Sequence, residues 1–88
     1  MKVAFSSSFK RAFQKRVKNN VEVEDRFWKR LDWFTADPKD PRLRTHKLSG
    51  KLEDLWSFSV TYDVRVIFYF AGEDKAVFID IGTHDEVY

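Results

Sequence analysis

The sequence predicts an α+β fold of order β-α-α-β-β-β, in which a helical hairpin packs on one face of a small, twisted, mainly antiparallel sheet. Two segments in the N-terminal half place apolar residues at helical spacing, and three segments in the C-terminal half alternate or run apolar as strands do. The chain has 88 residues, is 43% hydrophobic and contains nine Phe and three Trp, which suffices for one small core. We therefore expect a single domain over residues 1–88.

The first half of the chain predicts a short strand followed by two helices. Lys2–Phe5 alternates weakly and is expected at an edge of the sheet. Ser6–Ser8 then offer N-caps for a basic amphipathic helix, and Asn19–Asn20 separate it from a second helix that ends at Asp37–Pro38. Helical spacing assigns these residues to the core-facing stripes: Phe9, Ala12, Phe13 and Val17 in the first helix, and Val23, Phe27, Leu31 and Phe34 in the second.

The second half predicts three strands after a polar connector at 38–50. Trp56–Tyr62 alternates apolar with small polar residues, which indicates one buried and one open face. Val64–Phe70 is nearly continuous in apolar residues, as expected for a central strand, and a turn at 71–75 leads into the last strand. Strict alternation there places four residues on one face, namely Phe78, Asp80, Gly82 and His84. The residues expected to be largely buried are Phe27, Leu31, Phe34, Phe58, Val66, Phe68 and Ile79.

The composition excludes several kinds of protein. No cysteine occurs, which rules out disulfides and thiolate metal sites. The two histidines offer poor spacing for metal ligation, so no metal and no other cofactor is expected. No apolar run approaches membrane-spanning length, and the N-terminal segment turns polar too soon for a signal peptide. A cytoplasmic location is therefore expected, with no membrane partner.

Charge is distributed unevenly along the chain. Residues 1–51 hold 14 basic and 6 acidic side chains, a net charge of +8, whereas residues 52–88 hold 2 and 8, a net charge of −6. The first half therefore favours a polyanion or an acidic protein as partner, although the solvated faces of two amphipathic helices give the same pattern.

Two polar side chains stand out in the C-terminal half. His84 directly follows the last strand, and histidine is the side chain whose pKa suits proton transfer near neutrality. Arg65 interrupts the central strand, and a buried charge is costly unless it is paired. Arg65 is therefore expected either to emerge on the open face of the sheet or to pair with a carboxylate such as Asp63 or Asp80.

Three runs in the sequence carry a family resemblance. These are HKLSG at 46–50, LWSFSVTYDVRVIFYF at 55–70 and IGTHDEVY at 81–88. Together they resemble the RelE/ParE superfamily of bacterial toxins from toxin–antitoxin modules, and most closely its YafQ-like branch. The resemblance implies a metal-independent endoribonuclease that cuts mRNA, typically on the ribosome, and that a cognate antitoxin silences.

The resemblance also assigns roles to individual residues. It implies that His84 is the catalytic histidine, that Tyr88 is the terminal aromatic, and that Arg65 is the strand arginine of the superfamily. His46 and Asp63 fall on the other active-site positions. Relatives usually carry Lys, Arg or His on the first sheet strand, where this chain has Ser57 and Ser59. The residues expected to bind RNA phosphates are Lys47, Arg44, Arg42, Ser57 and Ser59.

Two other functions remain open for the same fold. A ParE-type toxin inhibits DNA gyrase by binding and performs no catalysis, which agrees with the missing basic strand residues. An inert module that binds RNA or a protein is the third possibility, since a fold alone does not determine function. Only His84, Asp63 and His46 distinguish these alternatives, because a pure binder has no need of them.

Overall fold

The computed structural model describes residues 1–49 and 54–88. Gly50, the last residue of the HKLSG run and of the predicted connector, lies outside these ranges. In chain order the elements are β1 (Lys2–Phe5), α1 (Ser7–Arg16), α2 (Val21–Ala36), the 3-10 helix η1 (Pro41–Leu43), β2 (His46–Lys47), β3 (Trp56–Ser59), β4 (Val64–Phe70), β5 (Lys75–Thr83) and α3 (His84–Val87).

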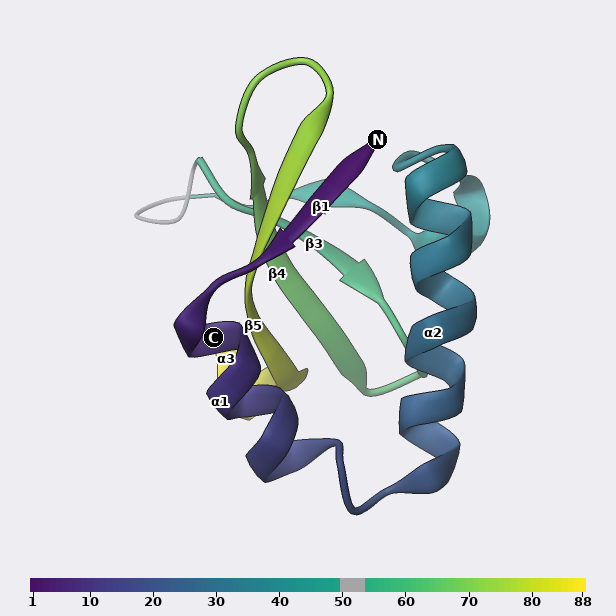
Figure 1. Ribbon diagram of the computed structural model, residues 1–88, viewed down its shortest axis with the longest axis vertical. Helices are drawn as coiled ribbons and strands as arrows, with labels where there is room; N and C mark the ends of the chain where they lie inside the picture. Colours follow the sequence, from purple (N-terminus) through teal and green to yellow (C-terminus); the bar gives the residue numbers. More distant parts are fainter. Residues whose placement is uncertain (50–53) are drawn as a thin grey trace.

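The five strands form one sheet in the order β1-β5-β4-β3-β2 (Figure 1). β1 pairs in parallel with β5 at one edge, and the other pairs are antiparallel. β4 is the middle strand, as its apolar sequence predicts. The α+β class and the helical hairpin on a mainly antiparallel sheet are thus confirmed.

The two long helices begin at the predicted caps. The Ser6 side chain accepts a hydrogen bond from the backbone N–H of Phe9 at 3.1 Å, and the Asn20 side chain accepts one from Val23 at 3.2 Å. Each cap satisfies a backbone donor that the first helical turn leaves without a partner. α2 ends at Ala36, directly before Asp37–Pro38, because proline cannot continue the helix.

The core is built from phenylalanine rings, with Phe78 of β5 at its centre. The Phe78 ring lies 5.2 Å from Phe34 of α2 and 5.6 Å from Phe9 of α1, measured between ring centroids. It also lies 5.5 Å from Phe58 of β3. Both helices therefore pack on the same face of the sheet, and aromatic packing compensates for the small size of the domain.

The alternation predicted for the last strand is wrong. Ile67 pairs with Asp80 but Phe68 pairs with Phe78, so Ile79 is an extra residue in a β-bulge. The bulge reverses the alternation, and Phe78 therefore faces the helices while Asp80 and Gly82 face the opposite side with Arg65. It also explains why Ile79, expected to be largely buried, is only partly buried.

The structure differs from the predictions in four smaller respects. Strand β3 ends at Ser59 rather than Tyr62, because the chain bends at 60–63 to reach β4. Leu31 is partly buried. The connector contains η1 and the short strand β2, and His84 begins a helix that strand periodicity does not reveal. No helix in the two described ranges is both long and apolar enough to cross a membrane.

Candidate functional site

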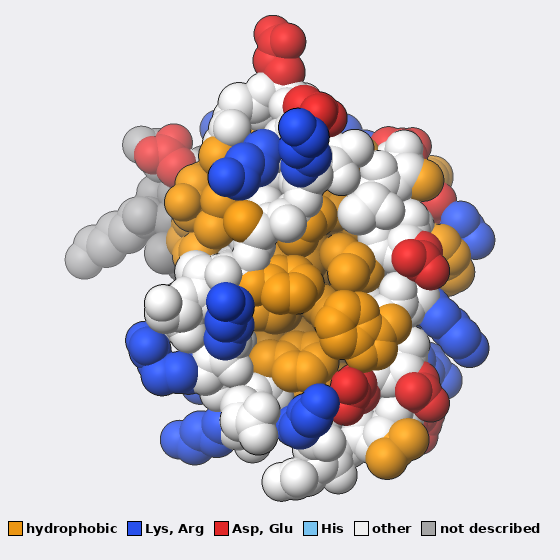
Figure 2. Space-filling model, viewed as in Figure 1, with side chains coloured by type: hydrophobic (Ala, Val, Ile, Leu, Met, Phe, Trp, Pro, Cys, Tyr) orange, Lys and Arg blue, Asp and Glu red, His pale blue; other side chains and the backbone are white. Residues whose placement is uncertain are grey.

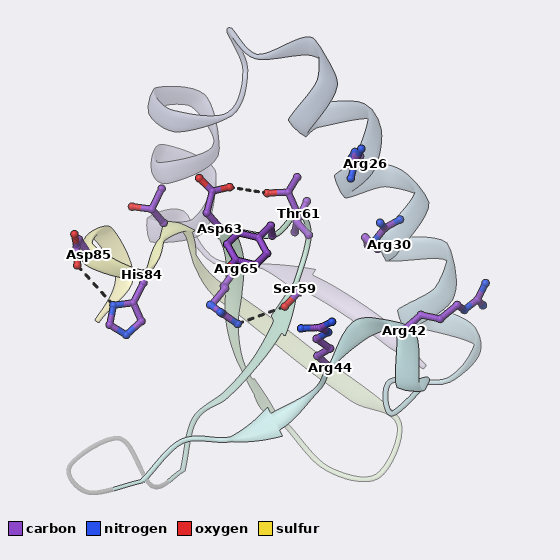
Figure 3. Close-up of a pocket in the computed structure, with 13 residues that line it drawn as sticks. Arg26, Arg30, Arg42, Arg44, Ser59, Thr61, Asp63, Arg65, His84 and Asp85 are labelled. Atoms are coloured by element: carbon purple, nitrogen blue, oxygen red, sulfur yellow. Dashed lines mark hydrogen bonds and ion pairs between the residues drawn. The ribbon is translucent and has the colours of Figure 1, made fainter.

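A cavity with a volume of about 720 Å³, called the main cavity below, opens where β3 bends into β4 (Figure 3). Helix α2, η1, the bend, β4 and the start of α3 all contribute to its wall. The volume lies within the roughly 300–1,000 Å³ typical of ligand pockets. Its arginine, aspartate and histidine lining residues are Arg26, Arg30, Arg42, Arg44, Asp63, Arg65, His84 and Asp85.

Arg65 extends from β4 into this cavity. Its Nη1 donates a weak hydrogen bond to the hydroxyl oxygen of Ser59 at 3.4 Å, while its Nε is buried without a hydrogen-bond partner. Within the described ranges, Arg65 forms no ion pair with Asp63, Asp80 or any other carboxylate. Arg65 therefore emerges on the open face, and its guanidinium keeps donors free for an anion.

A second hollow of about 370 Å³ shares Arg65 and His84 with the main cavity and adds His46 and Tyr88. The Nδ1 atom of His46 lies 3.0 Å from the carbonyl oxygen of Arg44. A carbonyl oxygen can only accept, so Nδ1 carries the proton and Nε2 of the neutral ring is left with its lone pair. His46 thus presents a basic nitrogen beside Arg65.

His84 is the first residue of α3, and 70% of its side chain is exposed. Its Nδ1 lies 3.6 Å from Oδ1 of Asp85, so a protonated imidazole can form an ion pair there. The ring also contacts Tyr88, with a centroid separation of 4.5 Å. The carboxylate of Glu86 accepts a hydrogen bond from the Thr83 N–H at 2.7 Å, which secures the start of this short helix.

Asp63 lies in the bend between β3 and β4 and lines the main cavity. The Thr61 hydroxyl donates to its Oδ1 at 3.1 Å and accepts a hydrogen bond from the Val64 N–H at 3.1 Å. Five predicted catalytic residues, Asp63, Arg65, His84, His46 and Tyr88, thus line two hollows that meet at Arg65 and His84.

The surface beside Gly82 is not open to a ligand. Gly82 is buried, and a Cβ atom at this position would meet Glu86 Oε1 at 2.8 Å and Arg16 Nη1 at 3.0 Å. Arg16 also pairs with Asp80 at 3.0 Å. Gly82 therefore gives space to the Arg16 and Glu86 side chains, and Asp80 serves this ion pair and lines neither hollow.

Of the five residues expected to bind phosphate, three line the main cavity and two do not. Arg42, Arg44 and Ser59 line the main cavity. Ser57 does not contact solvent, because its side chain is fully buried and its hydroxyl has no hydrogen-bond partner. Lys47 lies apart, in a hollow beside Trp56 and Tyr69.

Sequence reasoning missed Arg26 and Arg30 as site residues. Both extend from α2 toward the cavity, one helical turn apart (Figure 3). Burial, followed by the nearby charges of Arg26 and Arg42, lowers the pKa of Arg30 below its ordinary value. The i, i+4 spacing of these two arginines is the sequence signal that could have indicated a basic stripe.

A metal centre finds no support in the described residues. Within 1–49 and 54–88, no three His, Asp or Glu side chains lie close enough together to hold a metal ion.

Comparison with known proteins identifies the family. The family model described as a bacterial toxin of type II toxin–antitoxin systems, YafQ, matches residues 1–88. The chain belongs to the YafQ family of toxins. No curated protein sequence matches it.

Solved structures of YafQ and related toxins share the fold. YafQ from E. coli strain BL21(DE3) is 16% identical with a TM-score of 0.76, over 99% of this chain and 97% of that one. A metal-bound toxin from Helicobacter pylori is 20% identical with a TM-score of 0.79, over 100% and 99%. A YoeB/ParE toxin from Agrobacterium tumefaciens is 16% identical with a TM-score of 0.78, over 96% and 99%. These TM-scores show that the three toxins share the fold of this YafQ-family chain.

Proposed function

We propose that this YafQ-family toxin is a metal-independent endoribonuclease that cleaves mRNA in the cytoplasm, on translating ribosomes. The observation that carries the proposal is the convergence of His46, Arg65 and His84 at one hollow, beside a cavity lined by arginines. A gyrase inhibitor or an inert binding module does not need two imidazoles beside an unpaired guanidinium.

The proposed reaction is attack of an RNA 2′-oxygen on the adjacent phosphorus. The 2′-hydroxyl loses its proton to Nε2 of His46, the P–O5′ bond breaks, and protonated His84 gives a proton to the departing 5′-oxygen. The products are a 2′,3′-cyclic phosphate and a 5′-hydroxyl end. His46 suits the role of base because Arg44 holds its proton on Nδ1, and His84 suits the role of acid because Asp85 can pair with its protonated ring.

Arg65 would bind the phosphate that is attacked. Charge accumulates on the non-bridging oxygens in the transition state, and a guanidinium already in place stabilises it without reorganisation. The Nη1 atom of Arg65, which makes only the weak hydrogen bond to Ser59, is a donor available for this contact.

Cleavage of mRNA on translating ribosomes tests the proposal. His84→Ala should lose about 10²- to 10⁴-fold in single-turnover rate, the usual contribution of a general acid or base. His84→Gln should lose activity but still bind the ribosome. Because the His84 side chain is mostly exposed, both variants should remain folded under the assay conditions. If wild type and His84→Ala arrest growth equally and neither cuts mRNA, the gyrase-type or inert-binder function replaces this proposal.

The partner is proposed to be a cognate antitoxin, as the solved DinJ–YafQ complex from E. coli exemplifies for a relative. A groove of about 210 Å³ between α1 and α2 is lined mainly by aromatic rings, including Phe13 and Trp28, with Lys10 at its edge. Figure 2 shows hydrophobic side chains gathered at this place. An amphipathic antitoxin helix with acidic flanks would match both the rings and the basic face of α1.

Binding of the neighbouring gene product tests the antitoxin proposal. Trp28 is 43% exposed in the groove, and Trp28→Glu should weaken binding by about 30-fold, since an interface tryptophan commonly contributes about 2 kcal/mol. Val21 is an exposed apolar residue of α2 outside the groove, so Val21→Glu is the matched control and should bind normally. Equal binding by the two variants would exclude the groove as the docking surface.

A further inference from the structure

Three arginines line the main cavity on the side away from His84. In Figure 3, Arg26, Arg30 and Arg42 lie on the side of the cavity opposite His84 and Asp85, with Arg65 and Ser59 between them. Arg44 also lines the cavity and lies beside Ser59 in this view. The cavity thus has a basic end formed by α2 and η1, and an end where the proposed proton transfers occur.

Trp33 holds two of these guanidinium groups. The Cζ atom of Arg42 lies 3.8 Å from the centroid of the Trp33 ring, and the Cζ atom of Arg30 lies 4.2 Å from it. An arginine over an indole face is attracted by the electrostatics of the ring, and its planar donors keep a defined direction. Two long side chains are therefore ordered before any ligand arrives.

Asp40 fixes Arg42 further. Its carboxylate accepts hydrogen bonds from Arg42 Nε at 3.1 Å and from Arg42 Nη2 at 2.8 Å, so the guanidinium is clamped through one edge. The Nη1 atom of Arg42 takes no part in this clamp.

The remaining positive charge is poorly compensated. Within the described residues, Arg30 and Arg44 form no ion pair, and Arg26 pairs only with the exposed carboxylate of Glu22 at 3.4 Å. Arg44 also has φ = 54°, a left-handed conformation that is uncommon for a residue with a side chain. Arg30 and Arg44 are thus like charges on one cavity without a paired carboxylate, which favours binding of a polyanion.

We propose that Arg30, Arg42 and Arg44 form a phosphate subsite for the RNA strand beside the scissile linkage, and that Trp33 is the residue that positions it. This inference rests on the proposed function, because the subsite is useful only if a strand passes His84. The shared cavity favours RNA over an acidic peptide, since one strand can place successive phosphates on Arg65 and on the subsite. Arginine forks also match phosphate oxygens in pairs.

The test uses a fluorescent single-stranded RNA whose 2′-hydroxyls are methylated, so that it binds but cannot be cut. Arg30→Gln combined with Arg42→Gln should weaken binding by about tenfold or more. The slope of log affinity against log salt should shrink by about 1.4, since each neutralised phosphate of a single strand contributes about 0.7. Arg44 is not one of the two arginines over the Trp33 ring. The single variant Arg44→Gln should change the slope by about half as much as the double variant.

The matched control is Arg11→Gln combined with Lys15→Gln on α1. It removes the same charge from exposed positions that line none of the cavities described above. Its slope should stay close to the wild-type slope. Equal losses in the two double variants would overturn the proposal, because the arginines would then act only through net charge.

Trp33→Leu tests the positioning role, because it keeps every charge and an apolar side chain. On cleavable RNA it should raise KM about threefold or more and leave kcat unchanged. A wild-type KM, or a loss confined to kcat, would overturn the role of Trp33. Thermal unfolding of each variant shows whether it is folded, and Arg44→Gln remains informative if the double variant is not.

Two further measurements separate the possible failures. If wild type cuts RNA and the double variant cuts it with the same KM, the subsite is wrong while the proposed function stands. Suppose that wild type does not cut RNA, and that the Arg30/Arg42 double variant loses RNA binding while the Arg11/Lys15 control keeps it. The subsite then stands and the catalytic proposal fails. If polyglutamate binding falls as much as RNA binding, the arginines are a general anion surface and the RNA subsite is excluded.

Discussion

The rings of Tyr88 and His84 meet edge to face, with centroids 4.5 Å apart and planes at 65°. The Tyr88 N–H also donates to the carbonyl oxygen of His84 at 2.9 Å, so one helical turn joins the two residues. The contact restrains the imidazole, although Tyr88 itself is 42% exposed. An aromatic pair of this kind contributes about 0.5–1.5 kcal/mol.

Tyr88→Ala should therefore lower the single-turnover cleavage rate about 2- to 12-fold, by releasing the His84 ring. Tyr88→Phe keeps the ring and should cleave at nearly the wild-type rate. The two rates on the same RNA decide this prediction. A large loss in Tyr88→Phe would show that the hydroxyl, rather than the ring, acts in the site.

Arg65→Met should separate activity from stability. Methionine keeps the apolar part of the side chain and removes a buried Nε that has no partner, so the free energy of unfolding should not fall. Cleavage should slow by about 10²- to 10³-fold, as when one charge-stabilising donor is removed from an active site. Arg11→Met is the control for charge, and an Arg65→Met enzyme that cuts as fast as this control would contradict the prediction.

Gly82→Ala should impair cleavage through the position of α3. The added methyl group would lie 3.0 Å from Cβ of Glu86, which cannot move without its backbone. Gly72→Ala is the comparison, because Gly72 has φ = 100° and no atom within 4 Å of an added Cβ. It should destabilise the fold by about 1 kcal/mol or more and leave the rate of the folded enzyme unchanged. Denaturant unfolding and cleavage, measured for both variants, test this contrast.

Phe27→Ala should lower the free energy of unfolding by about 3–5 kcal/mol, because the ring is fully buried among the other phenylalanines. This is a large part of the stability of about 5–15 kcal/mol that a domain normally has. Tyr62 is 94% exposed, and Tyr62→Ala should change the free energy by no more than about 0.5 kcal/mol. Urea unfolding of both variants provides the measurement.

The Arg42 side chain, hydrogen-bonded to Asp40, lowers the pKa of that carboxyl from 3.8 to about 2. Since the folded-state pKa is the lower one, the pair stabilises the fold above about pH 4. That contribution disappears as the pH falls through about 2. The carboxyl resonance of Asp40 should titrate near pH 2 in wild type and closer to 3.8 in Arg42→Gln. An unchanged midpoint in the variant would exclude Arg42 as the cause.

Local sequence patterns determined much of this fold. Helical spacing, serine and asparagine caps and the Asp37–Pro38 stop predict both long helices, and the apolar run of β4 predicts the middle strand. These signals act within a few residues along the chain, so they can be read without knowing the fold. The family resemblance likewise named the five residues that meet around Arg65 and His84.

Only the tertiary structure decided which faces those residues occupy. The bulge at Ile79 depends on the register between β4 and β5, and it moves Phe78 into the core and Asp80 to the Arg16 side chain. The burial of Ser57 depends likewise on packing around the sheet. The basic end of the cavity joins α2 and η1, and Trp33 brings their arginines together only after the helix has packed on the sheet. Such contacts are non-local, and no periodicity within one segment encodes them.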